Sequence, residues 1–177
     1  TGIGRTGAGK LRLDTALLDF TNASGSVYLE SISETTLTES IINGSGDLYF
    51  TQSLGALNIT ELVRVINGRT IINIAETLNI DSEIWATRDL RISADTLTVT
   101  NASISSFYGD VTIRVKEDLI IDPGSTISAA EGSVRISSGG ALTVGELTSG
   151  KTITLRAEGS ILRSASSITA PILRLHS

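Results

Sequence analysis

The chain has 177 residues, a formal net charge of −5, 40% apolar and 4% aromatic residues, and neither Cys nor Met. This length is sufficient for one domain whose core must consist of Leu, Ile, Val and Ala. The acidic balance without any basic block argues against a nucleic-acid partner, the absence of Cys excludes disulfides and Cys-ligated metals, and apolar runs of only a few residues exclude a membrane span.

The first ten residues, TGIGRTGAGK, contain two nucleotide-binding signatures. Gly2 begins a G-x-G-x-x-G pattern, and Gly4 begins G-x-x-x-x-G-K, which ends at Lys10. A phosphate loop follows a buried strand and opens a helix, and its Lys precedes Ser or Thr. Here Leu11 occupies that position, and LRLD alternates like a strand. We therefore expect no nucleotide cofactor, but a glycine-rich lead-in to a first strand with Leu11 and Leu13 facing inward.

A pattern of three short elements then repeats about every 20 residues. The first element is a small or polar residue followed by apolar–x–apolar, and its copies start at Gly25, Gly46, Gly68, Arg88, Gly109, Gly132 and Gly150. The second carries the apolar pairs Leu57/Ile59, Leu78/Ile80, Leu97/Val99, Leu119/Ile121 and Leu142/Val144. The third contains Ser40-Ile41, Leu62-Val63, Glu83-Ile84, Ser103-Ile104, Thr126-Ile127, Glu146-Leu147 and Ser167-Ile168.

The alternation within every element has a period of two residues, which predicts strands, and no stretch has the helical period. Because one unit cannot bury its own apolar residues, the units must stack. The sequence therefore predicts a right-handed parallel β-helix over residues 1–177, with about eight coils of about 20 residues and three short strands in each coil. The missing initial Met is typical of a segment excised from a longer repeat protein.

The repeats resemble those of a bacterial family. The stretch GSVRISSGGALTVGELTSGKTITLRAEGSI (132–161) is similar to the repeats of filamentous haemagglutinin-like exoproteins, which are secreted adhesins of the two-partner secretion type. The stretch GAGKLRLDTALLDFTNASGSVYLES (7–31) resembles the unit that begins repeat blocks in such proteins. This resemblance implies a β-helical shaft and a secreted or cell-surface location.

A catalytic or metal site is not predicted. The expected outward column of the first element holds Tyr28, Tyr49, Ile71, Arg91, Thr112, Arg135 and Thr154, and that of the second holds Asn58, Asn79, Thr98, Ile120 and Thr143. Neither column pairs carboxylates, and we expect the acids Asp47, Asp89, Asp110, Glu117 and Asp118 to be scattered over turns. Asp47 and Asp110 share a turn offset, but Ser26, Arg69 and Lys151 interrupt a calcium-binding column there.

Carbohydrate binding or polysaccharide cleavage is the alternative hypothesis. A β-helical enzyme would place two carboxylates within about 10 Å of each other in a groove. A shaft would have neither a cleft nor a coupled titratable cluster. These features separate the two hypotheses.

The remaining candidates are surface contacts. Tyr28 and Tyr49 are expected to stack, Arg91 and Arg135 to share one column two coils apart, and Trp85 and the pair Phe107-Tyr108 to lie where units end and turn. Exposed aromatics with Arg are common at interfaces, although they also protect and space a β-stack, so Tyr28, Tyr49, Trp85, Arg91, Tyr108 and Arg135 are the candidate contact residues. The sequons at Asn22, Asn43, Asn58 and Asn101 are either turn motifs or glycosylation sites.

The predicted function is that of a structural or adhesive shaft, a rigid spacer in a large secreted or surface-exposed bacterial protein. The expected partners are a host or neighbouring-cell receptor or surface glycan, together with neighbouring repeats of the parent chain. Because open end coils expose strand edges, we also expect end-to-end self-association. No cofactor and no enzymatic activity are predicted.

Overall fold

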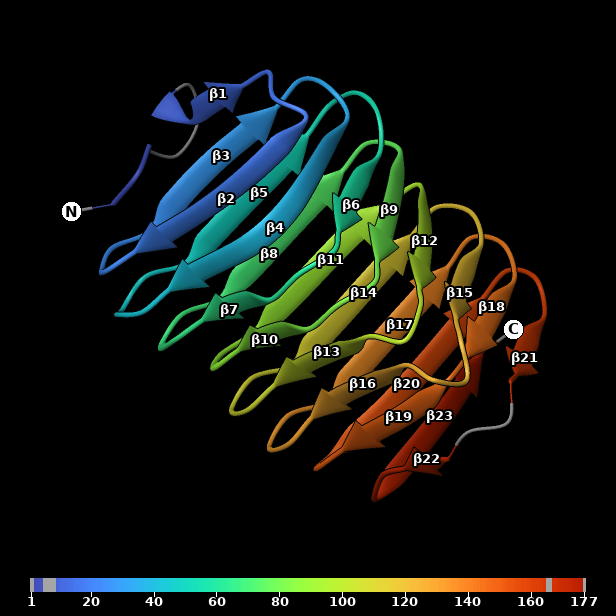
Figure 1. Cartoon of the computed structure of the whole chain (residues 1–177). Coiled ribbons are helices and arrows are strands. Elements are labelled where there is room, and N and C mark those ends of the chain that lie inside the picture. Colours follow the sequence, from blue (N-terminus) through green and yellow to red (C-terminus); the bar gives the residue numbers. More distant parts are fainter. Residues whose placement is uncertain (1, 5–8, 165–166, 177) are drawn as a thin grey trace.

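A computed structural model describes residues 2–4, 9–164 and 167–176, and it confirms the predicted parallel β-helix. The described chain winds through about eight turns, and equivalent strands of successive turns lie side by side along a rod (Figure 1). All strand pairs in the sheet ladders are parallel, as expected when each strand pairs only with its equivalents in the neighbouring turns. The N-terminal and C-terminal turns lie at opposite ends of the rod (Figure 1).

The first face of the rod is a nine-stranded sheet. In order along the rod its strands are β1 (Leu11–Leu13), β3 (Val27–Ser31), β5 (Leu48–Gln52), β8 (Thr70–Ile74), β11 (Leu90–Ala94), β14 (Val111–Val115), β17 (Val134–Ser138), β20 (Thr152–Ala157) and β23 (Ile172–His176). The predicted first elements form these strands from β3 to β20.

The second and third faces belong to one 14-stranded sheet. The second face contains β6 (Leu57–Ile59), β9 (Thr77–Ile80), β12 (Thr96–Val99), β15 (Leu119–Ile121), β18 (Leu142–Val144) and β21 (Ile161–Arg163). The third contains β7 (Val63–Val65), β10 (Ile84–Ala86), β13 (Ser103–Ser106), β16 (Thr126–Ala129), β19 (Glu146–Ser149) and β22 (Ile168–Thr169). Two longer strands, β2 (Leu17–Asn22) and β4 (Thr35–Ile42), run along both faces, and β4 joins them by pairing with β6 and β7.

Columns of apolar side chains fill the interior, as the sequence predicts. Leu57, Leu78, Leu97, Leu119 and Leu142 lie in register on successive strands of the second face, and each is at most 1% exposed. Such columns bury apolar surface continuously along the rod, and this burial is the main stabilising force of the fold.

The alignment of one predicted strand is wrong, and the burial of another is incomplete. Ser40 and Ile42, not Ile41, point inward from β4, because Ser40 pairs with Val63 and Ile42 with Val65. Leu11 lies in register with the buried Leu29, but its side chain is 46% exposed, because β1 has a neighbouring strand on one side only. The inward column is therefore correct at β1, although burial there is incomplete.

The opening glycine-rich segment is partly included in the described residues. Ile3 forms a parallel bridge with Val27, and Gly4 adopts a φ of 67°, which favours glycine. The lead-in therefore already lies against the first face at Ile3. Residues 5–8 of the two nucleotide-binding signatures lie outside the described residues.

Candidate functional site

The outer side of the first face carries most of the candidate contact residues. Strand alternation places two columns of side chains there. The first column is Tyr28, Tyr49, Ile71, Arg91, Thr112, Arg135 and Thr154, as predicted, and the second is Glu30, Thr51, Asn73, Ser93, Arg114, Ser137 and Arg156. Arg91 and Arg135 share the first column two coils apart, which confirms that prediction.

Aromatic and charged side chains meet at the N-terminal part of this face. Tyr28 and Tyr49 stack with their ring centroids 4.6 Å apart and their planes at 9°, as predicted. The Tyr49 hydroxyl donates to Asp47 Oδ2 at 3.1 Å and accepts from the Arg69 guanidinium at 3.0 Å. Tyr49 is therefore held by both the neighbouring ring and an ion pair, which favours a structural role for this stack.

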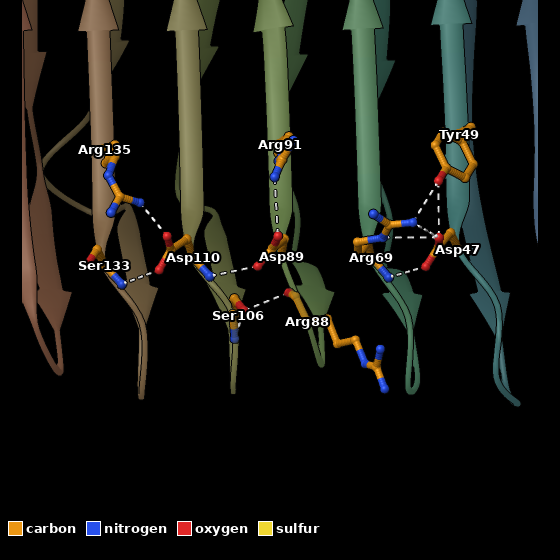
Figure 2. A network of polar contacts seen from close by, with 11 residues as sticks. Asp47, Tyr49, Arg69, Arg88, Asp89, Arg91, Ser106, Asp110, Ser133 and Arg135 are labelled. Carbon is orange, nitrogen blue, oxygen red and sulfur yellow. Dashed lines mark hydrogen bonds and ion pairs between the residues drawn. The ribbon is translucent and has the colours of Figure 1, made fainter.

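Three aspartates lie in one row at the start of the first-face strands, so the prediction that they are scattered over turns is wrong. Asp47, Asp89 and Asp110 directly precede β5, β11 and β14. One oxygen of each carboxylate accepts a backbone N–H from the next coil, from Arg69 at 2.8 Å, Asp110 at 3.2 Å and Ser133 at 2.8 Å, respectively. Each aspartate thus ties two successive coils together (Figure 2).

The second oxygen of each of these carboxylates faces an arginine. Asp47 pairs with Arg69 at 2.7 Å and Asp110 pairs with Arg135, both across one coil step, whereas Asp89 contacts Arg91 of its own coil at 3.4 Å. Figure 2 shows the three pairs side by side along the rod. Repeated Asp–Arg pairing makes this row a mixed surface of hydrogen-bond donors and acceptors.

The ion pairs change the acidity of two of the aspartates. Partial burial by itself raises the pKa of Asp47. The hydrogen bonds and charge of Arg69, together with the hydrogen bond from the Tyr49 hydroxyl, outweigh burial and hold this pKa below its ordinary value. Burial likewise works to raise the pKa of Asp110, whereas the Ser133 N–H and the Arg135 side chain lower it overall. Both carboxylates are therefore ionised at neutral pH.

A hollow of about 480 Å³, here called the arginine hollow, opens on the middle of this face. Side chains of the row and of both columns line it: Ile71, Asn73, Asp89, Arg91, Ile92, Ser93, Asp110, Thr112, Arg114 and Arg135. It contains the carboxylates of Asp89 and Asp110, which come from adjacent coils, and Asp89 Oδ1 lies 3.2 Å from the Asp110 backbone nitrogen. Two carboxylates from neighbouring coils thus share one hollow, and this part of the face differs from the cleft-free surface expected of a shaft.

A second hollow of about 350 Å³ adjoins the first at Asp89, which lines both. Its other lining residues are Asp47, Arg69, Arg88, Tyr108 and Gly109. Tyr108 is 60% exposed and contacts the Phe107 ring edge-on, with centroids 4.5 Å apart. This pair lies in the turn after β13, as predicted, and it offers an accessible aromatic surface beside the charged row.

The remaining candidates lie elsewhere. Trp85 occupies the middle of β10 on the third face, not a turn, and the Arg64 guanidinium lies 5.5 Å from its ring centroid. Among the sequons, Asn22 is buried, and its side-chain amide donates to the Ser24 and Gly25 carbonyls, so this nitrogen serves the turn. Asn58 accepts a hydrogen bond from Asn79.

Sequence reasoning missed the role of Asp89, Asp110 and Arg114 in the arginine hollow. The sequence contains a signal for the two aspartates, because Asp89 and Asp110 each stand immediately before the first inward residue of a first-face strand. Ser26, Arg69 and Lys151 interrupt the same offset in the sequence and so obscure the row. The structure changes only the last of these, since Ile153 pairs with Val134 and so places Thr152 there.

Among the described residues, no group of three or more His, Cys, Asp or Glu side chains is placed to hold a metal ion. The same residues include no helix of the length and hydropathy that crossing a membrane requires. No family model, curated protein or solved structure matches the chain.

Proposed function

We propose that this chain is a rigid shaft segment of a secreted or surface-exposed bacterial protein, which acts as a spacer and presents a contact surface on its first face. The observation that carries this proposal is the continuity of the ladders. Every first-face strand from β3 to β20 pairs with a neighbour on both sides, and one apolar core runs through the same turns. The resemblance of the repeats to adhesin shafts supports the location.

Rigidity follows from this arrangement. To bend the rod sharply or to open one central coil, hydrogen bonds of the ladders on all three faces and a layer of the apolar core must be disrupted together. The Asp–Arg row adds contacts between coils where the strands begin. The architecture therefore suits a spacer that keeps its length.

The charged groups favour contact over catalysis. Hydrolysis of a polysaccharide needs a carboxylic acid whose pKa is raised, so that it is protonated at working pH. Asp110, which lines the arginine hollow, has a lowered pKa, and its two oxygens accept from the Ser133 backbone N–H and the Arg135 guanidinium. Among the carbohydrate-directed alternatives, the arginine hollow accordingly favours binding.

Limited trypsin digestion tests the shaft proposal. Arg88 is exposed in the turn before β11, and Arg12 is exposed in the terminal strand β1. We expect slow cleavage at Arg88, because a protease must first open a coil with neighbours on both sides, and faster cleavage at Arg12. Rapid cleavage at Arg88 under native conditions would contradict a rigid shaft.

An assay for new reducing ends tests the role of this surface. Incubation of the chain with neutral and acidic polysaccharides is expected to release none above the background of a heat-denatured sample. Sustained release that Asp110→Asn abolishes would instead establish the polysaccharide-cleaving alternative.

A further inference from the structure

We propose that the arginine hollow binds a carboxylate-bearing sugar unit of an acidic polysaccharide. This inference goes beyond the spacer role, because a shaft can be rigid without binding a ligand. It rests on three arginines that come from three consecutive strands of the first face. Arg91 of β11, Arg114 of β14 and Arg135 of β17 all line the hollow.

These arginines retain donors for a ligand. Arg114 is exposed and makes no hydrogen bond or ion pair to any residue in the described part of the chain. Arg91 contacts Asp89 only at 3.4 Å, and its side chain is 60% exposed. A guanidinium presents five N–H donors in a planar fork that matches a carboxylate, so the hollow is suited to an anionic group.

The other polar groups indicate what surrounds that anionic group. Asp89 supplies a carboxylate acceptor, and the Thr112 hydroxyl can both donate and accept. The Asn73 amide supplies N–H donors, because its Oδ1 already accepts from the Ser93 hydroxyl at 2.7 Å. A ligand that carries one carboxylate among many hydroxyls matches this mixture. A sugar acid has that composition.

Two other polymers fit less well. Nucleic acid is bound through clustered Lys and Arg that follow a continuous phosphate backbone, and the sequence contains no such basic block. An extended peptide gains affinity by adding a strand to a sheet edge, but β11 and β14 are paired on both sides, and so no main-chain groups are free for it. The ligand must therefore be recognised through its own charged and hydroxyl groups.

The adjoining hollow extends this recognition to a polymer. Asp89 lines both hollows, and Tyr108 presents a 60% exposed ring in the second one. An aromatic ring offers an apolar face on which the flat, apolar side of a sugar ring packs, and its hydroxyl remains in water. A chain of sugars that crosses Asp89 would thus contact the arginines with one unit and Tyr108 with another.

Calorimetric titration with a tetramer of galacturonic acid, at low ionic strength and neutral pH, tests the proposal. We expect a Kd of about 1 mM or lower for the whole chain. Arg114→Gln is expected to raise the Kd at least about tenfold, because it removes a charged fork that has no structural partner. Arg156→Gln is the matched control, since Arg156 lies in the same outward column outside the arginine hollow.

The outcomes separate clearly. Selective loss of binding in Arg114→Gln, with Arg156→Gln unchanged and no binding of a neutral glucose tetramer, supports the proposal. Equal weakening by both substitutions would overturn it, because binding would then reflect general charge. Absence of binding to the folded chain, or equally tight binding of a glutamate tetramer, would also overturn it. A rod that resists trypsin but binds no sugar acid would leave the shaft proposal intact.

Discussion

Thr70 offers a direct test of how strictly the interior requires apolar groups. Its side chain is fully buried in the inward column between Leu48 and Leu90, and its hydroxyl has no hydrogen-bond partner. An unpaired buried hydroxyl costs about 1–3 kcal/mol, and valine replaces it by a methyl group of nearly the same size. Thr70→Val is therefore expected to stabilise the fold by about 1–3 kcal/mol, or by roughly 2–4 °C in Tm for each kcal/mol.

Thr35→Val is the matched control, because the sign of its effect should be opposite. Thr35 is equally buried, but its hydroxyl lies 3.0 Å from the Thr15 carbonyl oxygen, 3.1 Å from that of Ser33 and 2.7 Å from Ser31 Oγ. Its removal should cost about 1–3 kcal/mol. Urea unfolding followed by circular dichroism, with unchanged slopes, measures both. Destabilisation by both substitutions would refute the reasoning, because the Thr70 hydroxyl would then contribute a favourable interaction.

Three further predictions concern charge, close packing and the ends of the rod. Asp47→Asn should lower stability at neutral pH by less than about 1 kcal/mol, because Arg69 is 45% exposed, and the difference should vanish as the pH falls well below 3.8. Gly68→Ala should destabilise by about 1–3 kcal/mol or more, since its Cβ would lie 1.7 Å from the Gly46 carbonyl oxygen. The chain should self-associate with increasing concentration in light scattering, and Leu173→Lys, at the 46% exposed end of the core column, should reduce this.

The sign of the pH dependence follows from the lowered pKa of Asp47. A carboxylate whose pKa is lower in the folded chain contributes stability above its unfolded value, and this contribution is lost as the pH falls through the folded value. A difference between Asp47→Asn and the parent chain that grows at acidic pH would contradict it. Light scattering that stays monomeric over a wide concentration range would likewise count against association of the ends.

The period-two pattern was sufficient to predict the strands and the outward columns, because burial on one face fixes the register of a strand. It failed at Ser40 and Ile41, since a polar residue occupies an inward position at the corner strand β4. The arginine hollow was harder to predict. Its lining depends on how three arginines and two aspartates from different coils align in space, and the non-acidic residues at the same offset in other coils, such as Ser26 and Arg69, concealed the row.

The rod is rigid and has a constant rise, and the distance between two spin labels tests this property most directly. Because the chain contains no Cys, Glu30→Cys and Arg156→Cys can be labelled without other substitutions. Both positions lie in one outward column, six coil steps apart. At about 4.8 Å per step, pulsed electron paramagnetic resonance should give one narrow distribution centred near about 29 Å. A broad distribution, or a centre far from this value, would contradict the rigid rod.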